Sequence, residues 1–160
     1  MAKRKLDFQT ERDPKIKGSY RRRLDDAFAA LGLLDIAKFR PEAAFVFYYL
    51  TCEKVAKVIT GIAAAKPKGG GENFKKIKIH TDTLYKATQE LKLPVRKEEI
   101  IALFASNKSG SASHQRNKLF HDFGPTQVHH AKRDAPHLNK AMVQFSGLRQ
   151  SIVNYLDSAP

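Results

Sequence analysis

Residues 41–65 carry the apolar pattern that most restricts the fold of this chain. Pro41 suits the first turn of a helix, and apolar side chains then recur at intervals of three and four residues to about Ala65. They are Ala44, Phe45, Tyr48, Cys52, Val55, Ile59 and Ile62. A stripe of this kind predicts a long amphipathic helix whose apolar face must be covered by other elements.

The covering elements are expected to be helices, because only residues 76–80 (Lys-Ile-Lys-Ile-His) alternate, as a short extended piece would. Further helices are predicted over about 21–38, 81–91, 96–105, 113–123 and 134–156, with breakers at 66–71 and Pro94. Thr81 or Asp82 is expected to cap the third helix, and Asp134 and Pro136 to open the last one after a polar, His-rich loop. The predicted fold class is all-α, an up-down helical bundle of about five to six helices. Residues 1–19 are expected to form a basic flexible tail and residues 20–160 a single helical domain.

The net charge of +13 is unevenly distributed. Residues 1–23 contain nine Lys or Arg against three acids, and residues 66–78 contain five Lys against one Glu. Basic segments favour polyanions through phosphate contacts and counterion release. The residues predicted to bind nucleic acid are Arg21, Arg22, Arg23, Lys75, Lys76, Lys78 and Lys118. The alternative is a set of solvated cations that only keep the protein soluble, and charge alone does not separate RNA from DNA.

The single cysteine, Cys52, lies in the apolar stripe and cannot form an intramolecular disulfide, which fits a reducing, cytoplasmic setting. Nothing in the sequence activates it, so a buried, inert thiol is expected. The longest apolar run, residues 43–50, is far shorter than the ~20 residues that span a bilayer. No membrane partner is therefore expected.

Residues 114–123 bring a cation, an amide and an imidazole together as Arg116-Asn117-x-x-x-His121. An Arg fork matches phosphate oxygens, and histidine gives or takes protons near neutral pH. The Ser/Gly/Asn-rich residues 106–113 predict a loop with Ser113 as the helix N-cap. Asn117 and His121 then share a helix face, whereas Arg116 lies about 140° from His121. Arg116 must either bend round the helix or act beside a second copy of the motif. The alternative for His121 is a structural histidine that packs or binds a backbone carbonyl.

The string Arg-Asn-x-x-x-His-Asp, late in a small basic helical protein, resembles the Arg-x(4–6)-His motif of the HEPN superfamily. The resemblance covers the helix order over about residues 22–157. It implies a homodimeric, metal-independent endoribonuclease, a toxin or antiviral defence effector, with Arg116, Asn117 and His121 as catalytic residues. It also implies RNA as substrate, no cofactor, and an antitoxin or regulatory protein as a partner. Family toxins that are switched off by nucleotidylation carry a Tyr two residues after the motif His, and Phe123 stands there in this chain.

Glu53 and Lys57 lie four residues apart on the long helix and form an ordinary surface pair in one interpretation. In the other, Glu53 orients Arg116, because some HEPN proteins carry an acidic residue on an early helix near the active site. Five of the six histidines fall between residues 114 and 137, but their spacing does not match a zinc motif, so no metal is expected. The chain is predicted to be a metal-independent endoribonuclease. The alternative is that it is a non-catalytic helical RNA- or DNA-binding protein. A third possibility is a helical interaction subunit whose basic tail binds an acidic partner.

Overall fold

The computed structural model describes residues 10–63 and 74–158, and in these residues the regular secondary structure is entirely helical. The α-helices are α1 Pro14–Leu33, α2 Pro41–Ala63, α3 Thr81–Glu90, α4 Lys97–Phe104, α5 Ala112–His121, α6 Pro125–Ser146 and α7 Arg149–Asp157. Two short 3-10 helices, η1 Ile36–Lys38 and η2 Phe74–Lys76, precede α2 and α3. The prediction of an all-α helical bundle is confirmed.

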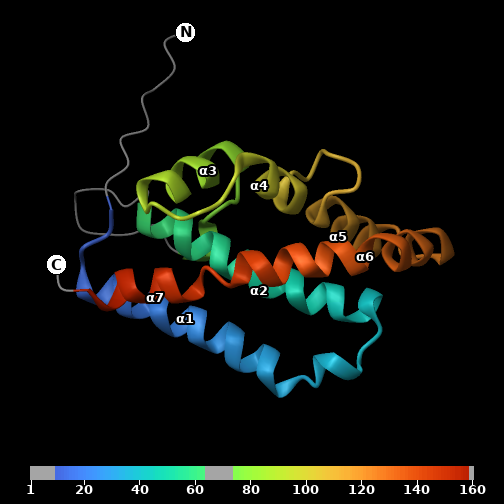
Figure 1. Cartoon of the computed structure of the whole chain (residues 1–160), viewed down its shortest axis with the longest axis horizontal. Coiled ribbons are helices and arrows are strands. Elements are labelled where there is room, and N and C mark those ends of the chain that lie inside the picture. Colours follow the sequence, from blue (N-terminus) through green and yellow to red (C-terminus); the bar gives the residue numbers. More distant parts are fainter. Residues whose placement is uncertain (1–9, 64–73, 159–160) are drawn as a thin grey trace, which may run out of the picture.

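Helix α2 forms the centre of the bundle and contacts α1, α3, α5 and α6 (Figure 1). Its apolar stripe is buried as predicted, with Cys52, Val55, Ile59 and Ile62 fully inaccessible to solvent. Helices α1 and α2 are antiparallel, whereas α2 and α6 run in the same direction, because α3, α4 and α5 carry the chain back between them (Figure 1). From Val58 to Ala63 every residue of α2 is buried, so the second half of this helix is enclosed on all sides.

The predicted helix over 134–156 is wrong at its start and in its middle. Helix α6 already begins at Pro125, so the expected His-rich loop is helical, and Pro136 lies inside the helix. An internal proline costs a helix roughly 3 kcal/mol, and burial of apolar side chains of α6 offsets this cost. The buried residues include Ala131, Ala135, Leu138 and Met142. The chain then breaks at Gly147, whose N–H bonds to the carbonyls of the last turn, before α7 starts.

The first helix also begins earlier than predicted. Asp13 caps α1 by accepting a hydrogen bond from the Lys15 N–H (2.8 Å). Lys17 is buried because its Nζ donates to the Ser158 carbonyl (2.7 Å) and lies 5.3 Å from the centre of the Tyr155 ring. Residues 14–19 of the predicted tail thus belong to the bundle, and residues 1–9 lie outside the described part of the chain.

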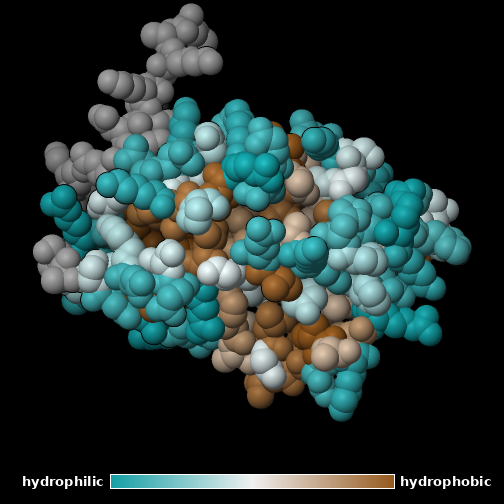
Figure 2. Space-filling view, viewed as in Figure 1, coloured by the Kyte–Doolittle hydropathy of each residue, from teal (hydrophilic) through white to brown (hydrophobic). Residues whose placement is uncertain are grey.

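The shorter helices agree with the sequence to within a few residues. Helix α3 is capped by His80 rather than Thr81 or Asp82, and Lys97 opens α4. The possible extended piece over 76–80 is not part of a strand: Lys76 ends η2, residues 77–80 have no regular secondary structure, and the His80 backbone is extended. No helix in the described ranges is both long and apolar enough to cross a bilayer. Figure 2 shows apolar side chains gathered over the end of α1 and η1, where Leu33 is 89% exposed.

Gly61 allows α1 to pack closely on α2. A Cβ atom at this position would lie 2.6 Å from the Tyr20 Oη and 3.1 Å from the Ile77 Cδ1. Tyr20 is buried and cannot swing into solvent. We expect Gly61→Ala to lower the free energy of unfolding by about 1–3 kcal/mol, because the steric cost exceeds the gain of up to about 1 kcal/mol in helix propensity.

Gly18→Ala in α1 is the matched control, because a Cβ atom there meets nothing within 4 Å. It should raise stability by about 0.5–1 kcal/mol through helix propensity alone. Urea unfolding of both variants, followed by circular dichroism, measures the difference. Equal stabilisation by the two substitutions would contradict the close α1–α2 contact.

Candidate functional site

Helix α5 carries the Arg-Asn-x-x-x-His string and is fixed at its start and along its side. Ser111, not Ser113 as predicted, is the N-cap: its Oγ accepts a hydrogen bond from the His114 N–H (3.0 Å) and donates to the Ala105 carbonyl (2.6 Å). The buried Gln115 side chain donates to Asp134 of α6. These contacts hold α5 against the bundle with little freedom to rotate. The predicted end of this helix at Gly124 is also slightly late, because α5 ends at His121.

Arg116 points inward from α5 and is half-buried between two aromatic rings. Its guanidinium lies 5.7 Å from the ring centre of Tyr49 on α2 and 5.1 Å from that of Phe120 on α5, within cation–π range. Its Nη1 donates to the Asn117 Oδ1 (2.9 Å), while its Nε is buried and has no hydrogen-bond partner in the described residues. A fixed positive charge therefore stands in an apolar setting with at least one donor unused.

The Tyr49 side chain, which contacts the Arg116 guanidinium, also interacts with the Ser113 hydroxyl. Burial raises the pKa of the Tyr49 hydroxyl, and the carboxylate of Glu53 raises it further, while the Ser113 hydroxyl and the Arg116 charge act in the opposite direction. Tyr49 is thus a neutral, buried group at ordinary pH. The sequence did not single out Tyr49 or Phe120 as neighbours of Arg116, because both contacts depend on how α5 packs on α2.

His121 is the last residue of α5, and its side chain is exposed. In the described part of the chain its imidazole has no hydrogen-bond partner. The Arg116 guanidinium donates to Asn117 and not to His121. The expected divergence of the two side chains is therefore present: Arg116 faces α2 and His121 faces solvent. The side-chain oxygen Oδ1 of Asn117 accepts the hydrogen bond from Arg116. The side-chain N–H groups of Asn117 are therefore available to a neighbour on the His121 face.

An apolar hollow of about 450 Å³ lies next to the motif. Phe120 and Phe123 border it and are 60% and 78% exposed. Val46 on α2 and Val128 on α6 form part of its floor. Exposed large apolar side chains grouped in this way mark an interaction surface more often than isolated ones do.

Glu53 does not contact Arg116 in an ion pair. Its carboxylate lies 3.6 Å from the Lys57 Nζ, one turn further along α2. Its charge contributes to the raised pKa of Tyr49, the neighbour of Arg116. A role for Glu53 in orienting Arg116 stays a prediction, and the surface pair with Lys57 is observed.

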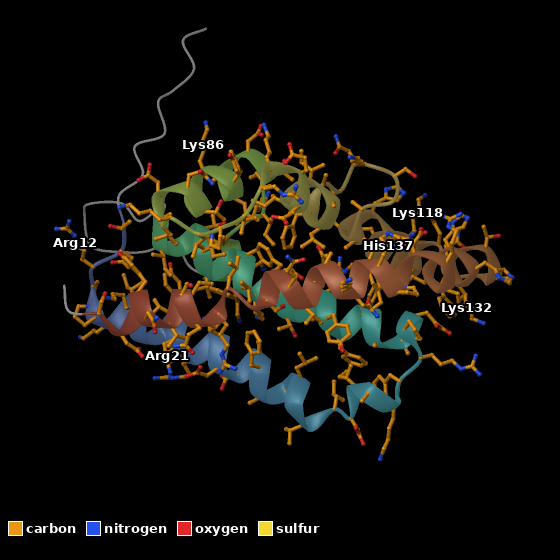
Figure 3. All side chains as sticks on the ribbon, viewed as in Figure 1. Arg12, Arg21, Lys86, Lys118, Lys132 and His137 are labelled. Carbon is orange, nitrogen blue, oxygen red and sulfur yellow. The ribbon has the colours of Figure 1, made fainter. Side chains whose placement is uncertain are left out.

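The predicted nucleic-acid-binding cations are distributed over separate parts of the surface. Arg21 is engaged by Asp25 (2.9 Å) and Asp157, and Lys118 by Asp122 (2.9 Å). The Lys118 contact holds the pKa of the Asp122 carboxyl below its usual range. Arg21 on α1 and Lys118 on α5 lie toward opposite ends of the molecule (Figure 3). The exposed members of the set are Arg22, Lys75, Lys76, Lys78 and Lys118. Arg23 lies against Phe74 instead.

Cys52 is fully buried, and its thiol donates to the Met142 carbonyl (3.1 Å). Burial raises its pKa to about 12, so the thiolate needed of a nucleophile is not populated near neutral pH. Residues 10–63 and 74–158 contain no group of three or more His, Cys, Asp or Glu side chains placed to hold a metal ion.

Comparisons with protein-family models, with curated proteins and with solved structures found no match to this chain.

Proposed function

We propose that this protein is a HEPN-type, metal-independent endoribonuclease. The 2′-hydroxyl of a ribose attacks the adjacent phosphorus, the bond to the 5′-oxygen of the next nucleotide breaks, and a 2′,3′-cyclic phosphate and a 5′-hydroxyl result. His121 accepts the proton of the 2′-hydroxyl or gives one to the leaving oxygen. Arg116 binds the phosphate and stabilises the charge that develops on it, and Asn117 orients the reacting groups through its amide.

The observation that carries this proposal is the state of Arg116. A buried N–H donor without an acceptor costs about 1–3 kcal/mol, and here it belongs to a permanent cation held between Tyr49 and Phe120. This Nε is closed to solvent, so an anionic oxygen would satisfy it once the guanidinium turns outward. His121 is exposed at the end of the same helix but turned away from Arg116, so it supplies a group that can transfer a proton to or from a phosphate bound by the Arg116 of a second subunit.

The proposal includes the setting that the resemblance implies. The enzyme acts in the cytoplasm as a toxin or defence effector, as a homodimer, under control of an antitoxin or other regulatory protein. The hollow bordered by Phe120 and Phe123 supports a protein interface close to the motif.

Incubation of the purified protein with single-stranded RNA, with and without excess EDTA, tests the reaction. Cleavage is expected to persist in EDTA and to leave cyclic phosphate ends. A DNA strand of the same sequence and a fully 2′-O-methylated RNA should stay intact, because neither has the attacking hydroxyl.

Two outcomes would count against the proposal. Cleavage that stops in EDTA and returns with a divalent cation assigns the chemistry to a metal. Salt-dependent RNA binding with no cleavage favours the second candidate, a non-catalytic nucleic-acid-binding protein, which the cationic surface around Phe74 also supports.

A further inference from the structure

Three cationic side chains from two helices converge on the ring of Phe74. Arg23 of α1 lies 4.5 Å from the ring centre, and Lys54 and Lys57 of α2 lie 5.1 Å and 5.8 Å from it. The ring is only 5% exposed and also packs on Tyr20, with the two ring centres 6.1 Å apart. The cations therefore form the outer layer over a buried aromatic base.

One cation over a ring is a common packing contact, but three around the same ring bring like charges close together. Only Lys57 has a carboxylate partner among the described residues, Glu53 at 3.6 Å. Neither Arg23 nor Lys54 forms an ion pair in these residues. Burial lowers the pKa of Lys54, and the charges of Lys57 and Arg23 lower it further. Counting the described residues alone, the cluster thus holds more positive charge than its carboxylates neutralise.

The cluster lies about two turns along α2 from the Arg116 site. Tyr49, Glu53 and Lys57 follow one another at intervals of four residues, each turned about 40° round the helix from the one before, so Lys57 lies about 80° from Tyr49. Tyr49 contacts Arg116 at one end of this path, and Lys57 joins the cluster at the other. The two ends are separated by about 12 Å along the helix axis at 1.5 Å per residue. An extended single strand crosses that distance in a few nucleotides.

We propose that Arg23, Lys54 and Lys57 form a second phosphate-binding site, which holds the backbone of the RNA strand a few nucleotides from the phosphate at Arg116. The identification of the strand as RNA rests on the proposed function. The ability of the cluster to bind an anion does not depend on that function. Glu53 sets the strength of the site, because its carboxylate is the group that competes with phosphate for Lys57.

Binding of a fluorescein-labelled, fully 2′-O-methylated oligoribonucleotide tests the site without cleavage. Lys54→Gln and Arg23→Gln should each weaken binding about fivefold at 0.1 M salt and reduce the slope of log affinity against log salt by about 0.7, the value for one phosphate contact on a single strand. Glu53→Gln should tighten binding, since it removes the competing carboxylate. A merely structural cluster would give no larger gain than Glu90→Gln, which removes an exposed carboxylate of α3.

Lys86→Gln is the matched control, because Lys86 is an exposed lysine on another helix, α3, and its side chain points away from the bundle (Figure 3). It changes the net charge by the same amount and should leave affinity nearly unchanged. Lys54→Arg keeps the positive charge and should restore most of the binding. Urea unfolding of each variant separates lost affinity from lost folding.

The site is overturned if Lys54→Gln and Arg23→Gln bind as the Lys86→Gln control does, and RNA cleavage by the unaltered protein can stand in that case. Conversely, both variants can bind more weakly while the unaltered protein cleaves no RNA. That result supports the phosphate-binding site and rules out the proposed nuclease activity. If a free mononucleotide or inorganic phosphate competes as well as the oligonucleotide, the cluster binds a free phosphate and the strand assignment is wrong.

Discussion

Replacing His121 with alanine should lower the rate of RNA cleavage by about 10²- to 10⁴-fold, the usual contribution of a general acid or base. The imidazole is exposed at the end of α5 and has no hydrogen-bond partner in the described residues. Its loss should therefore change the free energy of unfolding by no more than about 0.5 kcal/mol. Single-turnover cleavage of a labelled RNA, together with urea unfolding, measures both effects.

Arg116→Ala should lower the rate by about 10²- to 10³-fold, because a preorganised donor to the developing charge is removed. This substitution also deletes the contacts with Tyr49 and Phe120, so Arg116→Lys is the sharper variant. Lysine keeps the charge and loses the planar fork, and a large loss of rate in a folded Arg116→Lys protein would assign the effect to the fork.

His129→Ala and Arg12→Ala are the matched controls, since both residues are exposed and lie on other helices or segments. They should leave the cleavage rate close to that of the unaltered protein. A His121→Ala protein that cuts RNA at the normal rate would remove the proposed role of the imidazole.

The fold followed from the sequence wherever apolar spacing alone determines a helix. The stripe from Ala44 to Ile62 predicted α2 because a helix that is buried along most of its length shows its period without interruption. The start of α6 was missed because Pro136 and the neighbouring histidines resemble a loop. Ala131, Ala135 and Leu138 already carried the helical spacing through the proline.

The start of α1 could not be predicted, because its reason lies elsewhere in the chain. Lys17 is polar and looks solvated in the sequence, yet it is held by the Ser158 carbonyl and the Tyr155 ring at the far end of α7. Contacts of this kind, between residues distant in sequence, override local preference. A periodicity argument contains no information about them.

The candidate site shows the same division. The order of Arg116, Asn117 and His121 along one helix, and their divergence around it, followed from the spacing. The contact between Arg116 and Tyr49 of α2 did not follow from the spacing, because it depends on how α5 packs on α2. Lys54 and Lys57 were visible as cations three residues apart, but their convergence with Arg23 on Phe74 appears only when α1, α2 and η2 come together.

A mixture of two inactive variants should regain cleavage if the enzyme works as a homodimer with a composite site. Arg116 faces α2 while His121 faces solvent, so within one chain the two groups diverge. A two-fold axis beside α5 would place the Arg116 of one chain near the His121 of the other. The exposed Phe120 and Phe123 provide apolar surface for that contact.

In a dimer of one Arg116→Ala chain and one His121→Ala chain, one of the two sites keeps both groups. After complete exchange half of the dimers are mixed, so the mixture should reach about a quarter of the unaltered activity, from a starting level at least 10²-fold lower. Mixing Arg116→Ala with the Arg116→Ala/His121→Ala double variant is the control, because no dimer in that mixture has a complete site. Adding Phe123→Asp to both chains should abolish the gain by placing a charge in the apolar contact. If mass spectrometry shows that the chains have exchanged and the rate still does not rise, each site lies within one chain, and the composite arrangement is wrong even though the chemistry of Arg116 and His121 can stand.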